Sequence, residues 1–463
     1  MCSRSLTDLC AGIALALVTG QALAAPPASA GEVAGGGVAV PAPGQRQVLR
    51  LSDVLGSDAP ATAPRDSSAW GLALGQHIAR GTTGHPSILE ARSSVTGALA
   101  GADAARWQRA PTATFSREYA GKYASQTYSN LLRVQQPLWT GGQITAGIDL
   151  AQHQATRARH ALREAQRNLA LKITANWSDW ARASLRVERL GKLVEQQAAL
   201  LEMISRRYAQ GSATVSDEAL ARARLEGALG EQAQARIDLA WSRTQLERNT
   251  AGTVDDALLR DLDGALPDVP TLAEVIDAIE SAPALNRAAV EIEIARAELA
   301  QRRAGLHPQV YLRLDRQWGA IKDERVTIAL QGSTGAGLGG LAALDVQEAR
   351  IQSARLAVET LRNELRDQYT QEHIRHASAD QRARLTQAYA QTSSTVLASY
   401  RRQFDAGRRS WMELLNMVRE VHQADLDAAV ALVDQRVAAY RVLLLVRAPD
   451  LNNDFSFGQE LPR

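Results

Sequence analysis

A duplicated pattern constrains the fold of this chain more than any other feature of its sequence. The predicted elements over residues 70–250 are a helix, two short strands, a very long helix and a further helix, and the same order returns over residues 271–447. Self-similarity at a fixed spacing is typical of repeat architectures. Each copy has roughly 180 residues, whereas solenoid units have about 20–50. We therefore interpret the copies as the duplicated building block of one assembly.

Matching segments place the two copies in register. They combine proline-containing turns with the ends of long helices. The matches, each 196 or 197 residues apart, are His85-Pro86 with Ala282-Pro283, Ala110-Pro111 with His307-Pro308, and Tyr208–Gly211 with Phe404–Gly407. The two copies therefore share turns and helix ends as well as helices.

The first residues predict export from the cytoplasm. Residues 1–25 contain a basic residue, an apolar stretch and an A-x-A site ending at Ala24, which is the pattern of a secretory signal peptide. Both cysteines, Cys2 and Cys10, fall inside this segment. Because Cys10 precedes the apolar stretch, we expect no lipoprotein anchor. The mature chain would then have no thiol, which excludes disulfides, a CxxC redox site and cysteine metal ligands.

Composition excludes other classes of partner and site. The formal net charge is +2 on 463 residues, with no block of Lys or Arg, so nucleic acid is not expected. No apolar stretch of 18 or more residues follows the signal segment. A membrane-spanning part would therefore have to be a closed β-barrel. Residues 26–69 are rich in Ala, Gly, Pro and Ser, which predicts a flexible N-terminal arm.

Two unusually long helices are predicted at residues 143–209 and 341–406. No proline interrupts either range. Apolar or small residues recur in steps of four and three, which is typical of a coiled-coil seam. They are Ile144, Ile148, Ala151, Ala155, Ala158, Leu162, Ala165 and Leu169 in the first helix, and Ile351, Ala354, Val358, Leu361 and Leu365 in the second. At 1.5 Å per residue each helix is about 100 Å long, so it must pack against neighbours over its whole length.

Both long helices are predicted to end in a glycine turn. Gly211 and Gly407 follow them directly, and glycine in the left-handed conformation commonly terminates helices. The helices after the turns are expected at 215–250 and 410–447. Ser216 and Ser410, each followed by acidic residues, are the expected N-caps. We interpret the two segments as helix–turn–helix tips.

Short strands are predicted at the opposite end of the long helices. Val310, Leu312 and Leu314 alternate with polar residues, which indicates a strand with one apolar face. Strands of about ten residues cross the apolar band of an outer membrane when tilted. We expect strands at 111–120, 128–139, 308–318 and 324–332. The remaining ranges are helices at 70–108 and 271–304, a linker at 251–270 and a C-terminal tail at 448–463.

Three motifs resemble those of a known family. They are Val134–Gly142 before the first long helix, Tyr208–Asp217 at the first tip and Phe404–Glu413 at the second. Over about residues 70–450 the chain resembles the TolC family of bacterial outer-membrane channel-tunnels. The resemblance implies a mainly α fold with a small β part. Three chains would each give four strands to a twelve-stranded outer-membrane β-barrel, and the duplicated long helices would form a coiled-coil tunnel in the periplasm of a Gram-negative bacterium.

The resemblance also implies a gate at the periplasmic end of the tunnel. In members of the family an arginine two residues past the tip glycine, and two carboxylates one turn apart, line the closed entrance. Arg409 and Glu413 match the arginine and the first carboxylate, and Asn416 replaces the second. Asp217 occupies a similar place at the first tip. The alternative is that Arg409 and Glu413 form a solvated surface pair.

The family suggests partners on both sides of the periplasm. A periplasmic adaptor protein would dock on the tips, and an inner-membrane ABC exporter or proton-driven pump would supply the substrate. The further partners are two other copies of the chain and outer-membrane lipid, and no cofactor is expected. The tip residues expected to receive the adaptor are Gln210, Gly211, Ser212, Gly407 and Arg408.

Enzyme motifs are not found. There is no HExxH, GxSxG or P-loop sequence, and we interpret the glycine-rich run at 332–340 as the connection from strand to long helix. Two histidine pairs at helical spacing lack a third ligand, which favours solvated side chains over a metal site. These pairs are His153 with His160, and His373 with His376.

Two classes of function fit these features. The first is an export duct that carries substrate from an inner-membrane transporter to the outside. Because no cysteine follows the signal segment, the resemblance favours the non-lipidated members that serve type I secretion of a protein such as a toxin, with multidrug or metal efflux as the alternative. The second class is a soluble periplasmic coiled-coil scaffold. Fractionation between outer membrane and soluble periplasm distinguishes the two classes.

Overall fold

The computed structural model of the chain describes residues 69–122, 125–250, 252–254, 266, 268–319, 322–332 and 339–446. The expected signal segment at 1–25, nearly all of the arm at 26–69 and the tail at 448–463 lie outside the described residues. So does most of the glycine-rich run at 332–340. Every helix and strand named below belongs to one compact unit, Thr62–Arg463.

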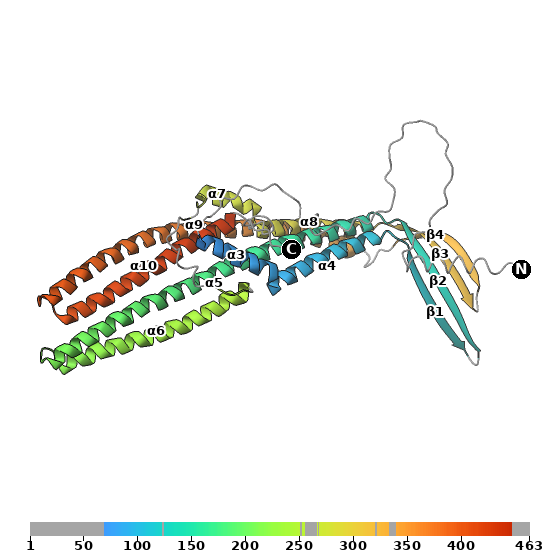
Figure 1. Cartoon of the computed structure of the whole chain (residues 1–463). Helices are drawn as coiled ribbons and strands as arrows, with labels where there is room; N and C mark the ends of the chain where they lie inside the picture. Colours follow the sequence, from blue (N-terminus) through green and yellow to red (C-terminus); the bar gives the residue numbers. More distant parts are fainter. Residues whose placement is uncertain are drawn as a thin grey trace, which may run out of the picture. The chain divides into compact units, whose positions relative to one another are not determined.

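The elements follow the duplicated order (Figure 1). The first copy contains α3 (Ala69–Gly84), α4 (Pro86–Trp107), β1 (Thr112–Lys122), β2 (Ser125–Trp139), α5 (Gln143–Ala209) and α6 (Val215–Thr250). The second contains α7 (Leu272–Asp277), the short 3-10 helix η2 (Ala278–Ser281), α8 (Pro283–Ala304), β3 (Gln309–Gly319), β4 (Asp323–Gln331), α9 (Gly339–Asp405) and α10 (Trp411–Val446). α5 and α6 have the same bounds as the helices expected from the sequence. The other long helices and the strands start or end within three residues of theirs.

Two predicted helices are wrong in one respect, because each is broken before a proline. The helix expected at 70–108 is divided at His85, whose φ and ψ are −67° and 136°. The helix expected at 271–304 is divided at Ala282, whose φ and ψ are −61° and 128°. The ring of a following proline disfavours the helical conformation of the residue before it. His85 also caps α4, since its Nδ1 accepts a hydrogen bond from the backbone N–H of Ser87 at 3.2 Å.

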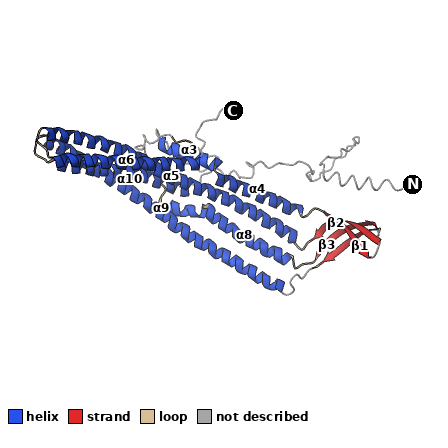
Figure 2. Cartoon of the chain, turned by 90° about the horizontal axis from the view of Figure 1, so that it is seen from below, coloured by secondary structure: helices blue, strands red, loops and turns tan. Residues whose placement is uncertain are grey.

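The four strands form one antiparallel sheet in the order β1-β2-β3-β4. The pairing of β2 with β3 joins the two copies, and its register places Arg133 opposite Asp315 and Val134 opposite Leu314. Figure 2 shows the sheet at one end of the helices. The turns between α5 and α6 and between α9 and α10 lie at the other end (Figure 1). This arrangement separates a sheet end from a tip end.

The helices pack on small and apolar side chains. In α6 the buried residues Ala221, Ala228 and Ala235 are seven apart, and in α9 the predicted seam residues Ile351, Val358 and Leu365 are buried. Seven-residue spacing keeps a narrow stripe facing the neighbouring helix. No helix among the described residues has both the length and the apolarity that crossing a bilayer requires.

The largest buried side chains lie near the middle of α5. Trp177 and Trp180 are fully buried, with ring centroids 6.3 Å apart in an edge-to-face arrangement. They belong to a core that includes Leu74 and Ile78 of α3 and Val433 of α10. α5 also contacts α4, α6 and α8, so it is the central helix of the described unit.

Candidate gate at the helical tips

Both tips end in the same backbone turn. Gly211 and Gly407 have φ values of 73° and 69°, in the left-handed region that favours glycine. The N–H of Ser212 donates to the carbonyl of Arg207, and the N–H of Arg408 donates to that of Gln403, each at 2.8 Å. A 6→1 bond of this kind closes a helix end by satisfying a terminal carbonyl. The turn itself is therefore duplicated, and differences between the tips come from side chains.

Arg409 is held by three neighbours at the second tip. Its Nη1 lies 3.3 Å from Glu413 Oε2, and its Nε donates to Gln403 Oε1 at 3.1 Å. Its guanidinium carbon lies 4.2 Å from the centroid of the Tyr400 ring. An arginine stacked on an aromatic ring and paired with a carboxylate loses much of its freedom to rotate. The predicted pair of Arg409 and Glu413 is thus in contact.

Glu413 also caps the start of α10 in the same turn. The backbone N–H of Glu413 donates to Ser410 Oγ at 3.3 Å, and the N–H of Ser410 donates back to Glu413 Oε2 at 3.4 Å. This reciprocal capping box begins α10 at the expected serine. The carboxylate oxygen that faces Arg409 is therefore fixed in place by backbone as well as by charge.

The first tip uses a different cap from the one expected. The prediction of Ser216 as the N-cap is wrong. Instead, Thr214 N and Oγ1 donate to Asp217 Oδ2 at 2.9 and 2.8 Å, and Asp217 N donates to Thr214 Oγ1 at 3.2 Å. A threonine three residues before an acidic residue makes the same capping box as at the second tip. The T-x-x-D spacing was a readable signal of this cap.

A hydrogen bond joins the two tips. The indole Nε1 of Trp411 donates to Asp217 Oδ1 at 2.9 Å. The backbone and hydroxyl bonds from Thr214, followed by the bond from Trp411, lower the pKa of Asp217 below its ordinary value of 3.8. Near them Arg207 of α5 stacks on Phe404 of α9, with the guanidinium carbon 4.2 Å from the ring centroid. Asp217 is thereby linked to the helix that bears Glu413.

Asn416 is placed differently from the other predicted gate residues. It is exposed and lies three residues beyond Glu413 on α10. Within the described part of the chain no hydrogen bond joins it to Arg409 or Asp217. The residues predicted for adaptor docking, Gln210, Gly211, Ser212, Gly407 and Arg408, are all exposed. Trp411, Tyr400 and Gln403 were not among the predicted site residues.

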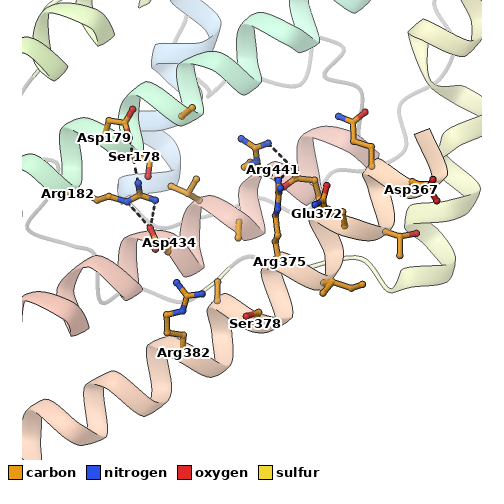
Figure 3. A pocket seen from close by; sticks show the side chains of 18 of the residues that line it. Ser178, Asp179, Arg182, Asp367, Glu372, Arg375, Ser378, Arg382, Asp434 and Arg441 are labelled. Carbon is orange, nitrogen blue, oxygen red and sulfur yellow. Dashed lines mark hydrogen bonds and ion pairs between the residues drawn. The ribbon is translucent and has the colours of Figure 1, made fainter. Parts of the chain in front are cut away.

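A long groove runs along α9 between α5 and α10, with a volume of about 1130 Å³ (Figure 3). Buried Glu372 accepts hydrogen bonds from Arg375 at 2.9 Å and from Arg441 at 2.8 and 3.0 Å. Arg182 Nε donates to Asp434 at 2.8 Å across the groove. These charges are paired with one another, so the groove presents a mixed polar surface instead of a site for one charge.

One histidine of each pair has a lowered pKa. Burial, then the neighbouring Arg163 and Arg159, lowers the pKa of His160, and burial lowers that of His376. Both shifts favour neutral side chains above pH 6.5. In the described ranges no three His, Cys, Asp or Glu side chains gather closely enough to hold a metal ion.

The sheet has one apolar and one polar face. On the polar face Arg133 makes two hydrogen bonds to Asp315, at 2.7 and 3.1 Å, and Gln317 donates to Ser129 at 2.6 Å. The opposite face carries large apolar side chains that are exposed in the single chain. They are Phe115, Tyr119, Tyr128, Leu312, Leu314, Trp318, Val326, Ile328 and Leu330. An exposed apolar sheet of this size requires a cover, either lipid or protein.

Comparison with known proteins identifies a similar family. Residues 82–252, which contain the first tip and the first two strands, match the family model described as "Outer membrane efflux protein". This segment of the chain is similar to the outer membrane efflux protein family. No curated protein matches the sequence.

Solved structures share the fold of this chain. The Neisseria gonorrhoeae MtrE outer membrane channel, in its open state, has a TM-score of 0.70 at 14% identity, covering 83% of this chain and 93% of MtrE. The outer membrane protein VceC of Vibrio cholerae has a TM-score of 0.63 at 17% identity, covering 81% and 95%. The Campylobacter jejuni CmeC outer membrane channel has a TM-score of 0.66 at 13% identity, covering 85% and 90%.

This similarity confirms the predicted fold class of duplicated long helices with a four-stranded sheet. It also confirms the predicted location, an outer membrane protein whose helices form a periplasmic tunnel. Both similarities favour an outer-membrane channel over the alternative of a soluble periplasmic scaffold.

Proposed function

We propose that three copies of this chain form one continuous duct. The apolar sheet face would meet lipid, and the strands of three chains would close into the twelve-stranded barrel expected from the resemblance. The supporting observation is that β1 and β4 are the two edge strands of the sheet. Edge strands expose unpaired N–H and C=O groups, which lipid cannot satisfy, so pairing with a further chain at each edge removes the cost.

The tips would form the gate of this duct. The observation that carries this proposal is the bond from Trp411 to Asp217, because it links the two hairpins of one chain at their ends. The pair of Arg409 and Glu413 lies in the same tip, 3.3 Å apart. Three copies would bring three such tips to one axis. Substrate would pass when these contacts break and the hairpins separate.

The transporter in the inner membrane would determine which substrate the duct carries. We put efflux of small molecules or metal ions first, because the matched family model carries that description. Type I secretion of a protein such as a toxin is the second candidate, and it is favoured by the absence of any cysteine after residue 10 that could bear a lipid anchor. An adaptor protein would dock on the exposed tip residues and connect the duct to an ABC exporter or a proton-driven pump.

Purification and export assays test these proposals separately. The protein should elute from detergent as a trimer and form channels in planar bilayers, and a stable detergent-free monomer would refute the duct. A deletion strain should become sensitive to drugs or metals if efflux is right. Loss of one secreted protein with unchanged drug and metal resistance would instead assign type I secretion.

A further inference from the structure

An arginine lies among aromatic rings on the mainly apolar face of the sheet. The guanidinium carbon of Arg117 is 5.0 Å from the ring centroid of Tyr119 and 4.7 Å from that of Tyr128. Tyr119 follows two residues later on the same face of β1, and Tyr128 lies directly opposite it on β2. Contacts with two rings hold the guanidinium through its faces. Its N–H edge is left to bind an acceptor.

Arg117 lies near the level at which the apolar part of this face ends. In the strand register it is opposite Asn130, and Asn130 is opposite Trp318. Trp318 is eight residues beyond Val310, the first apolar residue of β3, so the two are about 26 Å apart along the strand. A strand tilted by about 40° rises about 20 Å over that length. The apolar band of an outer-membrane sheet is about 25 Å tall, and arginine side chains extend toward the polar boundary.

Within the single chain, the described residues around Arg117 on this face provide no matching negative charge. Asn130 is neutral, and its amide donates to the carbonyl of Trp318 at 3.3 Å. Glu324 lies opposite Arg316 in the register of β3 and β4, two strands away from Arg117. Among the described residues no carboxylate forms an ion pair with Arg117, and its side chain is exposed. A cation at a membrane boundary without a protein partner favours an anionic headgroup.

We propose that Arg117, held between Tyr119 and Tyr128, binds a phosphate group of a lipid in the outer leaflet of the outer membrane. The end of the sheet away from the helices (Figure 1) would face that leaflet in the proposed duct. A guanidinium whose faces are stacked and whose edge is free matches a phosphate with two parallel N–H···O bonds. This proposal rests on the proposed insertion of the sheet through its apolar face.

Lipid retention by the purified trimer tests the proposal. Native mass spectrometry would follow retention of lipid A that carries two phosphates by the wild type, by Arg117→Gln and by Arg325→Gln. Arg325 is the matched control, because it lies on the polar face and pairs with Asp323. We expect Arg117→Gln to lower retention about tenfold, as expected from loss of a bidentate charged contact. Arg325→Gln should behave like the wild type.

Two further arms identify the ligand group. The wild type should retain lipid A without its phosphates only weakly, as Arg117→Gln retains intact lipid A. Millimolar inorganic phosphate should not compete with lipid A for the wild type. The proposal would be overturned if the wild type and Arg117→Gln retained lipid A equally. It would also be overturned if the wild type retained lipid A with and without phosphates equally, or if free phosphate competed. Outer-membrane fractionation separates the causes: a trimer inserted in the membrane but indifferent at Arg117 refutes only the lipid site, whereas a chain that does not insert refutes both.

Discussion

The indole nitrogen of Trp411 donates a 2.9 Å hydrogen bond to the carboxylate of Asp217, and this bond connects two helix ends that are 194 residues apart in the chain. Asp217 is at the same time the partner of Thr214 in the cap of α6. The contact between the tips is therefore built on a carboxylate whose position the backbone already fixes.

Removing this one bond should loosen the tips. Trp411→Phe keeps an aromatic ring but removes the N–H donor, so the two hairpins lose their link while α10 keeps its capping box. We expect a several-fold higher open probability in planar bilayers. Trp241→Phe is the control, because Trp241 is an exposed tryptophan of α6 outside the tip. Identical openings for Trp411→Phe and the wild type would show that this bond does not hold the gate.

The same contact should respond to acid. Hydrogen bonds lower the pKa of Asp217 below 3.8, so its folded-state stabilisation is complete above that pH and is lost as the pH falls through the lowered pKa. Channel opening caused by this group should therefore appear only below about pH 4. Conductance recorded from pH 7 to pH 3 should rise at the acid end in the wild type. Asp217→Asn should be open already at pH 7, and an acid response equal to that of the wild type would count against this role.

The ion pair at the second tip should control both opening and cation block. Arg409→Ser should raise single-channel conductance, and Glu413→Gln should weaken block by multivalent cations from the periplasmic side. Glutamine retains an acceptor for Ser410, so the cap of α10 survives while the charge is lost. Exposed pairs contribute only about 0–1 kcal/mol each, but three symmetric copies act on one opening. If the double variant conducts and blocks like the wild type, the constriction lies elsewhere.

Two helical glycines should give opposite results when changed to alanine. A Cβ at Gly81 of α3 would lie 2.4 Å from Ile173 Cδ1 and 2.7 Å from the carbonyl of Asn249, whereas a Cβ at Gly97 of α4 meets nothing within 4 Å. Gly81→Ala should cost about 1–3 kcal/mol through overpacking. Gly97→Ala should instead stabilise by up to about 1 kcal/mol through helix propensity. Thermal unfolding in detergent distinguishes them, and equal shifts would contradict the packing of α3 on α5.

Two tyrosines form a similar pair. The hydroxyl of buried Tyr369 accepts a 2.7 Å hydrogen bond from Arg167 of α5, which is itself buried. Tyr369→Phe would leave that donor unsatisfied, at a cost of about 1–3 kcal/mol. Tyr389, whose hydroxyl donates to Glu420 at the surface, is the control, and Tyr389→Phe should change stability little. If the melting temperature falls equally for both variants, the burial of Arg167 is not critical for the stability of the fold.

The sequence predicts the long helices well because residues within each helix determine where it forms and where it ends. Seam residues such as Ile148, Ala155 and Leu169 repeat along α5, and Gly211 ends it in a left-handed turn. The breaks at His85 and Ala282 were missed although both precede proline, because the elements on either side are helical and their apolar patterns continue. Local steric rules, correctly applied, would have found them.

The candidate site was predicted only in part, for a physical reason. Arg409 and Glu413 lie on one helical turn, so their contact follows from sequence spacing. The bond between Trp411 and Asp217 depends on how two hairpins pack, and no local pattern encodes that distance. The stacking of Arg207 on Phe404 is of the same kind. Contacts between the two copies of the duplicated unit can be identified only from the structure.

The ladder between β2 and β3 has a consequence for symmetry. It pairs the two copies in the same antiparallel manner as each copy pairs its own strands, and α5 packs against α8 and α10 of the other copy. A trimer of such chains would therefore be a pseudo-hexamer, with six similar hairpins around one axis. Only every second tip would carry the pair of Arg409 and Glu413. The helical wall of the duct would have approximate six-fold symmetry, whereas the ring of Arg409–Glu413 pairs would have three-fold symmetry.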